Sequence, residues 1–139
     1  MRLQVLDLGC GVGGPAREIC RFSRVHVTGV NNNAHQVKRA QQITADSGRF
    51  VAERCSFVQS DFMKLPFSDG SYDHAYAIEA TCHAPDAAAC YREIARCIKP
   101  GGMFVCYEWV RGCLSACHCL LWTAETQHPV CLPAGDLLK

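Results

Sequence analysis

A glycine-rich turn near the start of the chain, residues 9–14 and called the glycine loop below, has the composition of a ligand-binding loop. Gly9, Gly11 and Gly13 follow a short apolar run, and Pro15 suits the first turn of a helix because its missing N–H costs nothing there. Glycines permit backbone angles closed to other residues and let a ligand approach the main chain closely. The spacing also matches the dinucleotide fingerprint, in which a pyrophosphate rests on a helix N-terminus.

Two neighbouring features favour a cationic ligand over a dinucleotide at this loop. Asp7 stands two residues before the first glycine, where a carboxylate would order the loop and attract an ammonium or sulfonium group. The next β-branched run ends in Asn31, Asn32 and Asn33, so it offers no carboxylate where an NAD enzyme would hold the ribose. On these residues alone, a dinucleotide site and a turn that binds nothing stay as alternatives.

Strand-like and helix-like patterns alternate along the chain. Short apolar or β-branched runs predict strands over residues 3–8, 25–30, 55–59, 72–78 and 103–109. Helices are predicted over residues 15–23, 33–46 and 86–97. Asn33 or Asn32 would cap the second helix, and Asp86 the third. The third helix also carries a charged set, interpreted as its solvated face: Arg92, Glu93 and Arg96.

This alternation predicts an α/β fold, a parallel sheet with helices on both faces. Ligands of such sheets bind beyond the carboxyl ends of the strands, near the point where strand order reverses, and the candidate residues fall at such ends. With 139 residues, of which 49% are hydrophobic and 19% charged, the chain is long enough for one domain with a core. The formal net charge of +1 gives no electrostatic reason to expect a nucleic-acid or anionic-membrane partner.

The sequence also bears on the location of the chain and on the redox state of its cysteines. No apolar run approaches the roughly 20 residues that cross a bilayer, and the first strand pattern begins too early for a signal peptide, so the chain is interpreted as intracellular. The sequence has 11 cysteines, which without an export signal are expected to be reduced thiols. Seven of them fall singly in the repeating pattern and are expected to act as small apolar residues: Cys10, Cys20, Cys55, Cys82, Cys90, Cys97 and Cys106.

Five segments together resemble one enzyme family. They are residues 5–18, 29–33, 60–67, 76–86 and 107–109. In this order and spacing the sequence resembles the sterol 24-C-methyltransferases, which are class I S-adenosylmethionine-dependent methyltransferases. The likeness covers about residues 3–110, and the stretch YAIEATCHAPD at residues 76–86 is its most specific part.

The resemblance implies a Rossmann-like fold and a reaction. A methyl group would pass from S-adenosylmethionine to the C24 double bond of a sterol side chain, leaving a side-chain carbocation that then loses a proton. A sterol substrate, peripheral association with the endoplasmic reticulum membrane and a homo-oligomer are the partners it suggests. A methyltransferase for another small molecule and a non-catalytic fragment that binds the cofactor are the alternatives.

By analogy with the family, each part of S-adenosylmethionine has a binding residue here. The glycine loop would line the methionine portion, with Asp7 beside it. Asn31 or Asn32 would meet the ribose hydroxyls, because an amide both donates and accepts hydrogen bonds. Asp61 would accept from the adenine amino group and Phe62 would lie alongside the ring, although Asp61 also suits a loop cap.

The catalytic set is expected where the fourth and fifth strands end. A cationic donor and a cationic intermediate favour aromatic faces and carboxylates in a water-poor site, which Tyr76, Glu79 and Glu108 would supply. His83 lies one helical turn from Glu79 if that segment is helical, so the two would act together in proton removal. A solvated Glu79, a packed His83 and a core Tyr76 are the alternatives.

The chain departs from the family at both ends. It starts at the first strand, so the family's aromatic-rich N-terminal region is expected to be absent, and the likeness ends near residue 110. We therefore expect a partial core over residues 1–110, a poorly ordered Cys-rich tail over 111–139, and last strands that are missing or replaced. The fifth strand would then be a sheet edge and the chain marginally stable. The tail matches the ligand spacing of a zinc site only loosely, at Cys113, Cys117, His128 and Cys131, so no metal is expected.

Overall fold

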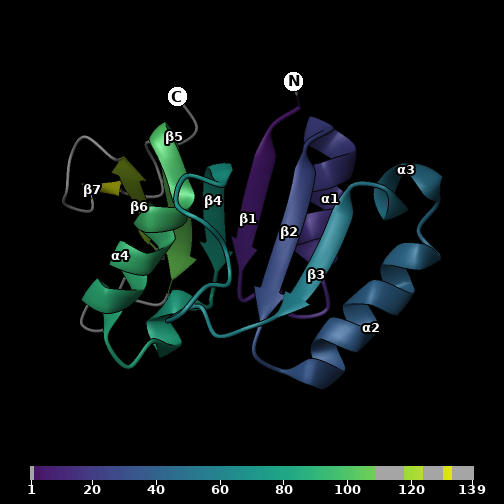
Figure 1. The fold of residues 1–139 in the computed structure, drawn as a ribbon, viewed down its shortest axis with the longest axis horizontal. Helices are drawn as coiled ribbons and strands as arrows, with labels where there is room; N and C mark the ends of the chain where they lie inside the picture. The colour runs from purple at the N-terminus through teal and green to yellow at the C-terminus, as the bar shows by residue number, and fades with distance from the viewer. Residues whose placement is uncertain (1, 109–117, 124–129, 133–139) are drawn as a thin grey trace.

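A computed structural model describes residues 2–108, 118–123 and 130–132, and its centre is one twisted sheet (Figure 1). The strands are β1 (Gln4–Leu8), β2 (His26–Asn31), β3 (Cys55–Gln59), β4 (Tyr72–Ile78), β5 (Ile98–Glu108), β6 (His118–Thr123) and β7 (Val130–Leu132). They lie in the order β3-β2-β1-β4-β5-β6-β7. The first five are parallel to one another, as the alternation predicted. Strand β6 is antiparallel to β5, and β7 is antiparallel to β6.

Helices cover both faces of the parallel part, which confirms the predicted fold class. They are α1 (Gly14–Ser23), α2 (Ala34–Ala45), α3 (Arg49–Ala52) and α4 (Ala87–Cys97), with a short 3₁₀ helix, η1, at Thr81–His83. One apolar core joins α1, α2 and α3 to β1–β3, and a second joins α4 to β1, β4 and β5. Successive strand residues alternate between the cores: Val5 faces the first, and Leu6 and Leu8 face the second.

Side-chain caps explain the starts of α2 and α4. The Asn33 side chain accepts from the backbone N–H groups of His35 and Gln36 at 3.0 and 3.1 Å, so the cap of α2 is Asn33. Asp86 caps α4 by accepting from the Ala89 N–H at 2.9 Å, as predicted. The short helix α3 was not expected, because four residues carry no usable period.

The sheet continues past β5, so the prediction that β5 is an edge strand is wrong. Residues Met103–Glu108 of β5 pair antiparallel with β6, and β6 pairs with β7. An antiparallel return needs no crossover helix, which is why a search for strand-then-helix patterns misses it. Residues 118–123 and 130–132 of the predicted Cys-rich tail thus form strands, whereas the suggested zinc ligands Cys113, Cys117 and His128 lie outside the described ranges.

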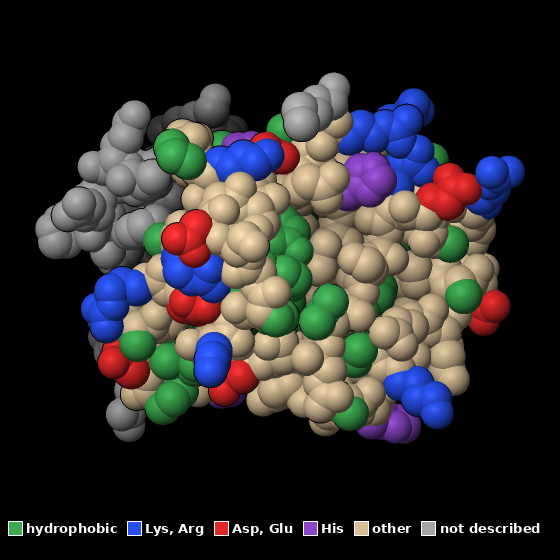
Figure 2. Space-filling model, viewed as in Figure 1, with side chains coloured by type: hydrophobic (Ala, Val, Ile, Leu, Met, Phe, Trp, Pro, Cys, Tyr) green, Lys and Arg blue, Asp and Glu red, His purple; other side chains and the backbone are tan. Residues whose placement is uncertain are grey.

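The prediction that Arg92, Glu93 and Arg96 form a solvated face of α4 is only partly correct. Arg92 is exposed, but the side chains of Glu93 and Arg96 are only 19% and 31% exposed because they bind the loop between β3 and β4. On the face seen in Figure 2, cationic and anionic side chains are interspersed along the margins.

Of the seven single cysteines, six are buried, as expected for small apolar residues, and Cys82 is exposed. None of the described helices has the length and apolar character required to span a bilayer. In the same described ranges, no three His, Cys, Asp or Glu side chains form a group suited to a metal ion.

Candidate functional site

A cavity of about 400 Å³ lies at the carboxyl ends of β1–β4, next to the point where strand order reverses between β1 and β4. Its lining residues are Gly9, Gly11, Asn31, Asn32, Gln36, Asp61, Phe62, Met63, Glu79, Ala80, His83 and Pro85. Eight of these were candidates from the sequence, although they are scattered over 75 positions from 9 to 83. Four other candidates are absent from the lining: Asp7, Gly13, Tyr76 and Glu108.

The glycine loop has left-handed backbone at all three predicted glycines, with φ angles of 72°, 54° and 75° at Gly9, Gly11 and Gly13. The Gly9 N–H donates to Val30 O at 2.9 Å, which ties the loop to the end of β2. A Cβ on Gly9 would lie 2.3 Å from the Ala80 Cβ, whereas one on Gly11 would meet nothing within 4 Å. The loop is therefore closely packed at Gly9 and open to a ligand at Gly11.

This contrast predicts different costs for the same substitution. Gly11→Ala is expected to lower the free energy of unfolding by about 1 kcal/mol, the strain of a left-handed non-glycine residue. Gly9→Ala is expected to cost about 3 kcal/mol, because steric overlap with Ala80 adds to the same strain. Urea denaturation of both variants measures the difference. Equal losses would show that the Ala80 segment moves aside without cost.

Arg17 of α1, which was not predicted from the sequence, binds the main chain of the glycine loop. Its side chain is buried, and Nη1 donates to Val12 O at 2.8 Å and to Thr44 Oγ1 at 3.3 Å. The available signal was position: Arg17 lies three residues before Cys20, on the apolar face of the helix. A buried guanidinium that donates to a loop carbonyl fixes the loop in place.

The end of β2 supplies amide groups to the cavity. Asn31 Nδ2 donates to Gln36 Oε1 at 2.7 Å and lies 3.4 Å from Gly11 O, and Asn31 Oδ1 accepts from the Asn33 N–H at 3.3 Å. Most of the hydrogen-bonding capacity of Asn31 is thus used within the protein, while Asn32 is exposed at the cavity. Gln36 was missed, although a glutamine three residues after a cap is a known helix-start signal.

The segment after β3 brings Asp61 and Phe62 to the cavity. Asp61 Oδ1 accepts from the Met63 N–H at 2.8 Å, and Asp61 O accepts from the Lys64 N–H at 3.0 Å. Asp61 therefore does both things considered for it: it caps a turn and it lines the cavity. Phe62 packs partly on the core beneath α4.

Glu79 and His83 line the same cavity, but not on one continuous helix. Glu79 has a left-handed backbone with φ 51°, and its N–H donates to Tyr107 O at 2.8 Å, so helical structure begins only at Thr81. Both side chains are exposed. A non-glycine residue in left-handed backbone at a cavity is strained, and the surrounding structure must hold it.

Glu108 lies behind this segment. Its Oε1 accepts from the N–H groups of Ala80 and Thr81 at 3.1 and 2.6 Å and from Thr81 Oγ1 at 2.7 Å. Burial by itself would raise the pKa of Glu108, but these hydrogen bonds and one from Cys82 outweigh it and hold the pKa below its ordinary value. Because it is 4% exposed and absent from the lining, Glu108 orders the 80–82 segment and does not reach the cavity surface.

Asp7, which is buried, and Tyr76, which is partly buried, lie opposite each other on the paired strands β1 and β4. Burial raises the pKa of Asp7 from 3.8 to about 7, an effect that the neighbouring Tyr76 hydroxyl partly offsets. Burial and the Asp7 charge raise the pKa of Tyr76. Among the described residues, no partner has hydrogen-bond geometry to Asp7 Oδ2 or the Tyr76 hydroxyl. A buried carboxyl with an unmatched oxygen costs stability.

Comparisons with known proteins agree with this arrangement. A model of the methyltransferase domain family matches residues 6–106. The cycloartenol-C-24-methyltransferase of Arabidopsis thaliana is 57% identical over 106 residues, and a sterol 24-C-methyltransferase of Saccharomyces cerevisiae is 50% identical over 106. Each match covers 76% of this chain but only 31% and 27% of the relative, so the chain spans less than a third of their length.

Solved structures share the fold at similar coverage. A putative sarcosine dimethylglycine methyltransferase from Galdieria sulphuraria superposes with a TM-score of 0.74 at 31% identity, over 77% of this chain and 40% of that one. The [4+2]-cyclase SpnF gives 0.73 at 32% identity, over 77% and 39%. Residues 6–106, which the family model matches, contain the glycine loop, most of the parallel sheet and all of the cavity lining. The chain therefore belongs to the methyltransferase domain family and has its Rossmann-like fold.

Proposed function

We propose that this chain binds S-adenosylmethionine in the cavity and forms the catalytic core of a methyltransferase that acts on C24 of a sterol side chain. The observation that carries the proposal is the convergence of eight predicted positions, from the ends of four strands, on one cavity. The names of the relatives at 50–57% identity support the sterol, because they specify cycloartenol or sterol C24 as the methylated group.

The cavity fits the cofactor part by part. Open space above Gly11 admits the methionine portion against bare backbone. The buried Asp7 carboxyl does not line the cavity, so it favours the positive charge of the cofactor through its electrostatic field and not by contact. Asn32 and Gln36 offer amides to the ribose hydroxyls. Asp61 retains an oxygen that its turn does not use and can accept from the adenine amino group, with Phe62 beside the ring.

The remaining residues suit methyl transfer to an alkene. When bound, S-adenosylmethionine supplies an electrophilic methyl group. The alkene π pair forms the new C–C bond, sulfur keeps the C–S pair, and the cationic side chain is neutralised when a proton leaves. Glu79 stabilises that positive charge and, with His83, accepts the proton, while Glu108 and Thr81 hold their segment in place.

Other acceptors and a non-catalytic role are the competing hypotheses. Fold does not decide among them, since the similar structure of SpnF is that of a [4+2]-cyclase. A panel comparing cycloartenol with tocopherol precursors and phosphoethanolamine discriminates the acceptor. An intracellular location at a sterol-containing membrane, and a homo-oligomer, are further parts of the proposal by family analogy.

The first test is calorimetric titration of the purified chain with S-adenosylhomocysteine, using NAD as control. Saturable binding of S-adenosylhomocysteine alone is the expected result, because the cavity has amides in place of the carboxylate that holds an NAD ribose. Binding of NAD, or of neither ligand by a folded chain, would contradict the proposal. Sterol assays follow from the first outcome only.

A further inference from the structure

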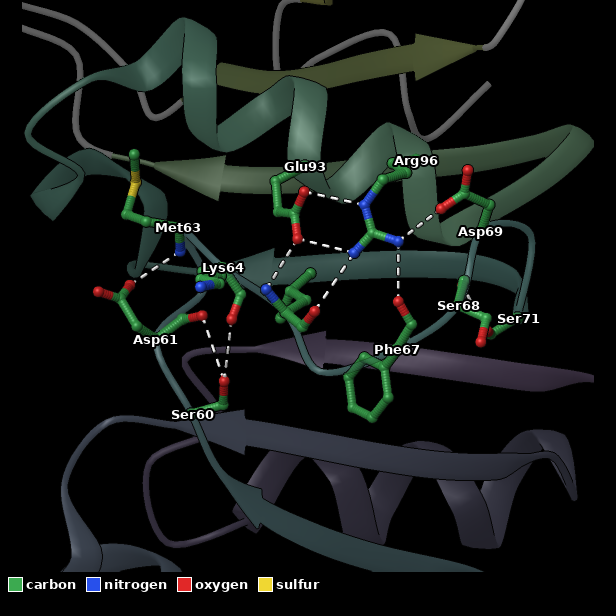
Figure 3. Close-up of polar contacts among 11 residues, drawn as sticks. Ser60, Asp61, Met63, Lys64, Phe67, Ser68, Asp69, Ser71, Glu93 and Arg96 are labelled. Atoms are coloured by element: carbon green, nitrogen blue, oxygen red, sulfur yellow. Dashed lines mark hydrogen bonds and ion pairs between the residues drawn. The ribbon is translucent and has the colours of Figure 1, made fainter.

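The loop between β3 and β4 is held by two charged residues of α4 (Figure 3). Arg96 Nη1 donates to Phe67 O at 2.8 Å and to Asp69 Oδ1 at 2.7 Å, and Nη2 donates to Leu65 O at 3.2 Å. Its Nε and Nη2 also bind the Glu93 carboxylate at 3.0 and 2.7 Å. One guanidinium thus fixes the main chain at two places along a segment with no helix or strand of its own.

Glu93 binds the same loop, and the two side chains, Arg96 and Glu93, are together called the clamp. Glu93 Oε1 accepts from the Leu65 N–H at 2.8 Å, so the peptide groups on both sides of Leu65 are bound to α4. The Gly70 N–H donates to Arg96 O at 2.9 Å, which anchors the far end of the loop. Leu65 itself is 5% exposed, and its side chain belongs to the core under α4.

The clamp is connected to the cavity through a tight turn. Ser60 Oγ donates to Lys64 O at 3.3 Å, and the Met63 N–H donates to Asp61 Oδ1, so residues 60–64 form one compact unit (Figure 3). Leu65 follows directly. The position of this turn is therefore set on one side by β3 and on the other by the clamped Leu65.

We propose that Arg96 and Glu93 are positioning residues for adenine recognition, because they hold the loop that places Asp61 and Phe62 at the cavity. The inference rests on the proposed use of S-adenosylmethionine and adds a determinant of base specificity that does not touch the ligand. Neither residue lines the cavity. Their effect passes through Leu65 and the 60–64 turn.

The test compares two ligands that differ only at the base. S-adenosylhomocysteine carries the amino group that Asp61 would accept from, and S-inosylhomocysteine carries a carbonyl there. The wild-type chain is expected to prefer the adenine ligand by about tenfold or more, because the inosine ligand cannot make the hydrogen bond from the amino group to the Asp61 carboxylate. Arg96→Met is expected to remove the preference, because it lowers affinity for the adenine ligand by about tenfold more than affinity for the inosine ligand, whose base relies only on Phe62. Arg92→Met, an exposed arginine on the same helix, is the matched control and keeps the preference.

Two further variants keep the test decisive if Arg96→Met does not fold. Arg96→Lys retains the charge but not the fork of donors, and Glu93→Gln loses the charge that Leu65 N–H and Arg96 share, so both should reduce the base preference. Hydrogen exchange at the amide of Leu65 should accelerate in all three. Retained preference in the folded variants, or equal weakening of both ligands, would overturn the positioning role alone. A wild-type chain that binds neither ligand would overturn the proposed function, and this inference with it.

Discussion

Replacing Asp7 by asparagine is expected to make the ligand-free chain more stable at pH 8 and to remove a fall in stability between pH 5 and pH 8. Asp7 is 2% exposed, and burial raises its pKa to about 7 from 3.8. Between these two values the folded chain keeps a proton that the unfolded chain has released. Stability therefore declines as pH rises through this window, and the penalty is complete above pH 7.

The size of the effect follows from the width of that window. Each pKa unit corresponds to about 1.4 kcal/mol, so wild type should lose about 2–3 kcal/mol relative to Asp7→Asn between pH 5 and pH 8. Urea denaturation of both proteins at several pH values gives the difference, and other titrating groups cancel in it. Parallel curves would show that Asp7 is ionised in the folded chain at all these pH values.

Ligand addition tests whether the Asp7 carboxylate, which destabilises the ligand-free chain, contributes to ligand binding. A cationic ligand at the glycine loop favours the ionised carboxylate, so saturating S-adenosylmethionine should flatten the pH dependence of the wild type. Asp7→Asn, although more stable when empty, should bind that ligand more weakly. A variant that is both more stable and equally tight would mean that the buried charge serves neither binding nor folding.

Glu79→Gln is expected to lower the rate of methyl transfer by about 100-fold, the usual loss on removing a positioned base. The amide keeps the size of the side chain and can occupy the same strained backbone, but it neither balances a positive charge nor accepts a proton. The expected change is in kcat, with little change in the affinity for S-adenosylhomocysteine, which has no sulfonium charge.

The measurement is transfer of a labelled methyl group to cycloartenol, in a protein that joins this chain to the flanking segments of a full-length relative. Glu18→Gln is the matched control, because Glu18 lies on α1 and is not in the cavity lining. Its rate should equal that of the wild type. Unchanged kcat in Glu79→Gln would remove Glu79 from the catalytic set and leave His83 as the remaining candidate.

Elements whose cause is local were predictable from the sequence. The caps at Asn33 and Asp86, the left-handed glycines and the five parallel strands depend on residues within a few positions of one another. The cavity followed because parallel strands bring their carboxyl ends to one edge, whatever the separation in sequence.

Features that depend on distant partners were not predictable. Arg96 has the helical spacing of a solvated residue, and only the carbonyls of Leu65 and Phe67, about 30 positions earlier, show that it is bound. Glu108 sits at a strand end with other polar residues, so nothing local shows that it faces backbone N–H groups and not the cavity. The antiparallel β6 likewise depends on its pairing with β5.

The clamp on the β3–β4 loop also constrains the order of folding. Residues 65–70 receive their anchors from a helix 26 to 31 positions later in the chain. A chain emerging during synthesis therefore has the glycine loop long before it can fix the opposite wall of the cavity. Such non-local contacts form late, after the entropy of the intervening segment has been lost. A nascent chain that ends before α4 would contain β1–β4 together with Asp61 and Phe62, but it would lack the side chains that anchor their loop. Preference for the adenine base should therefore be acquired late, when α4 docks.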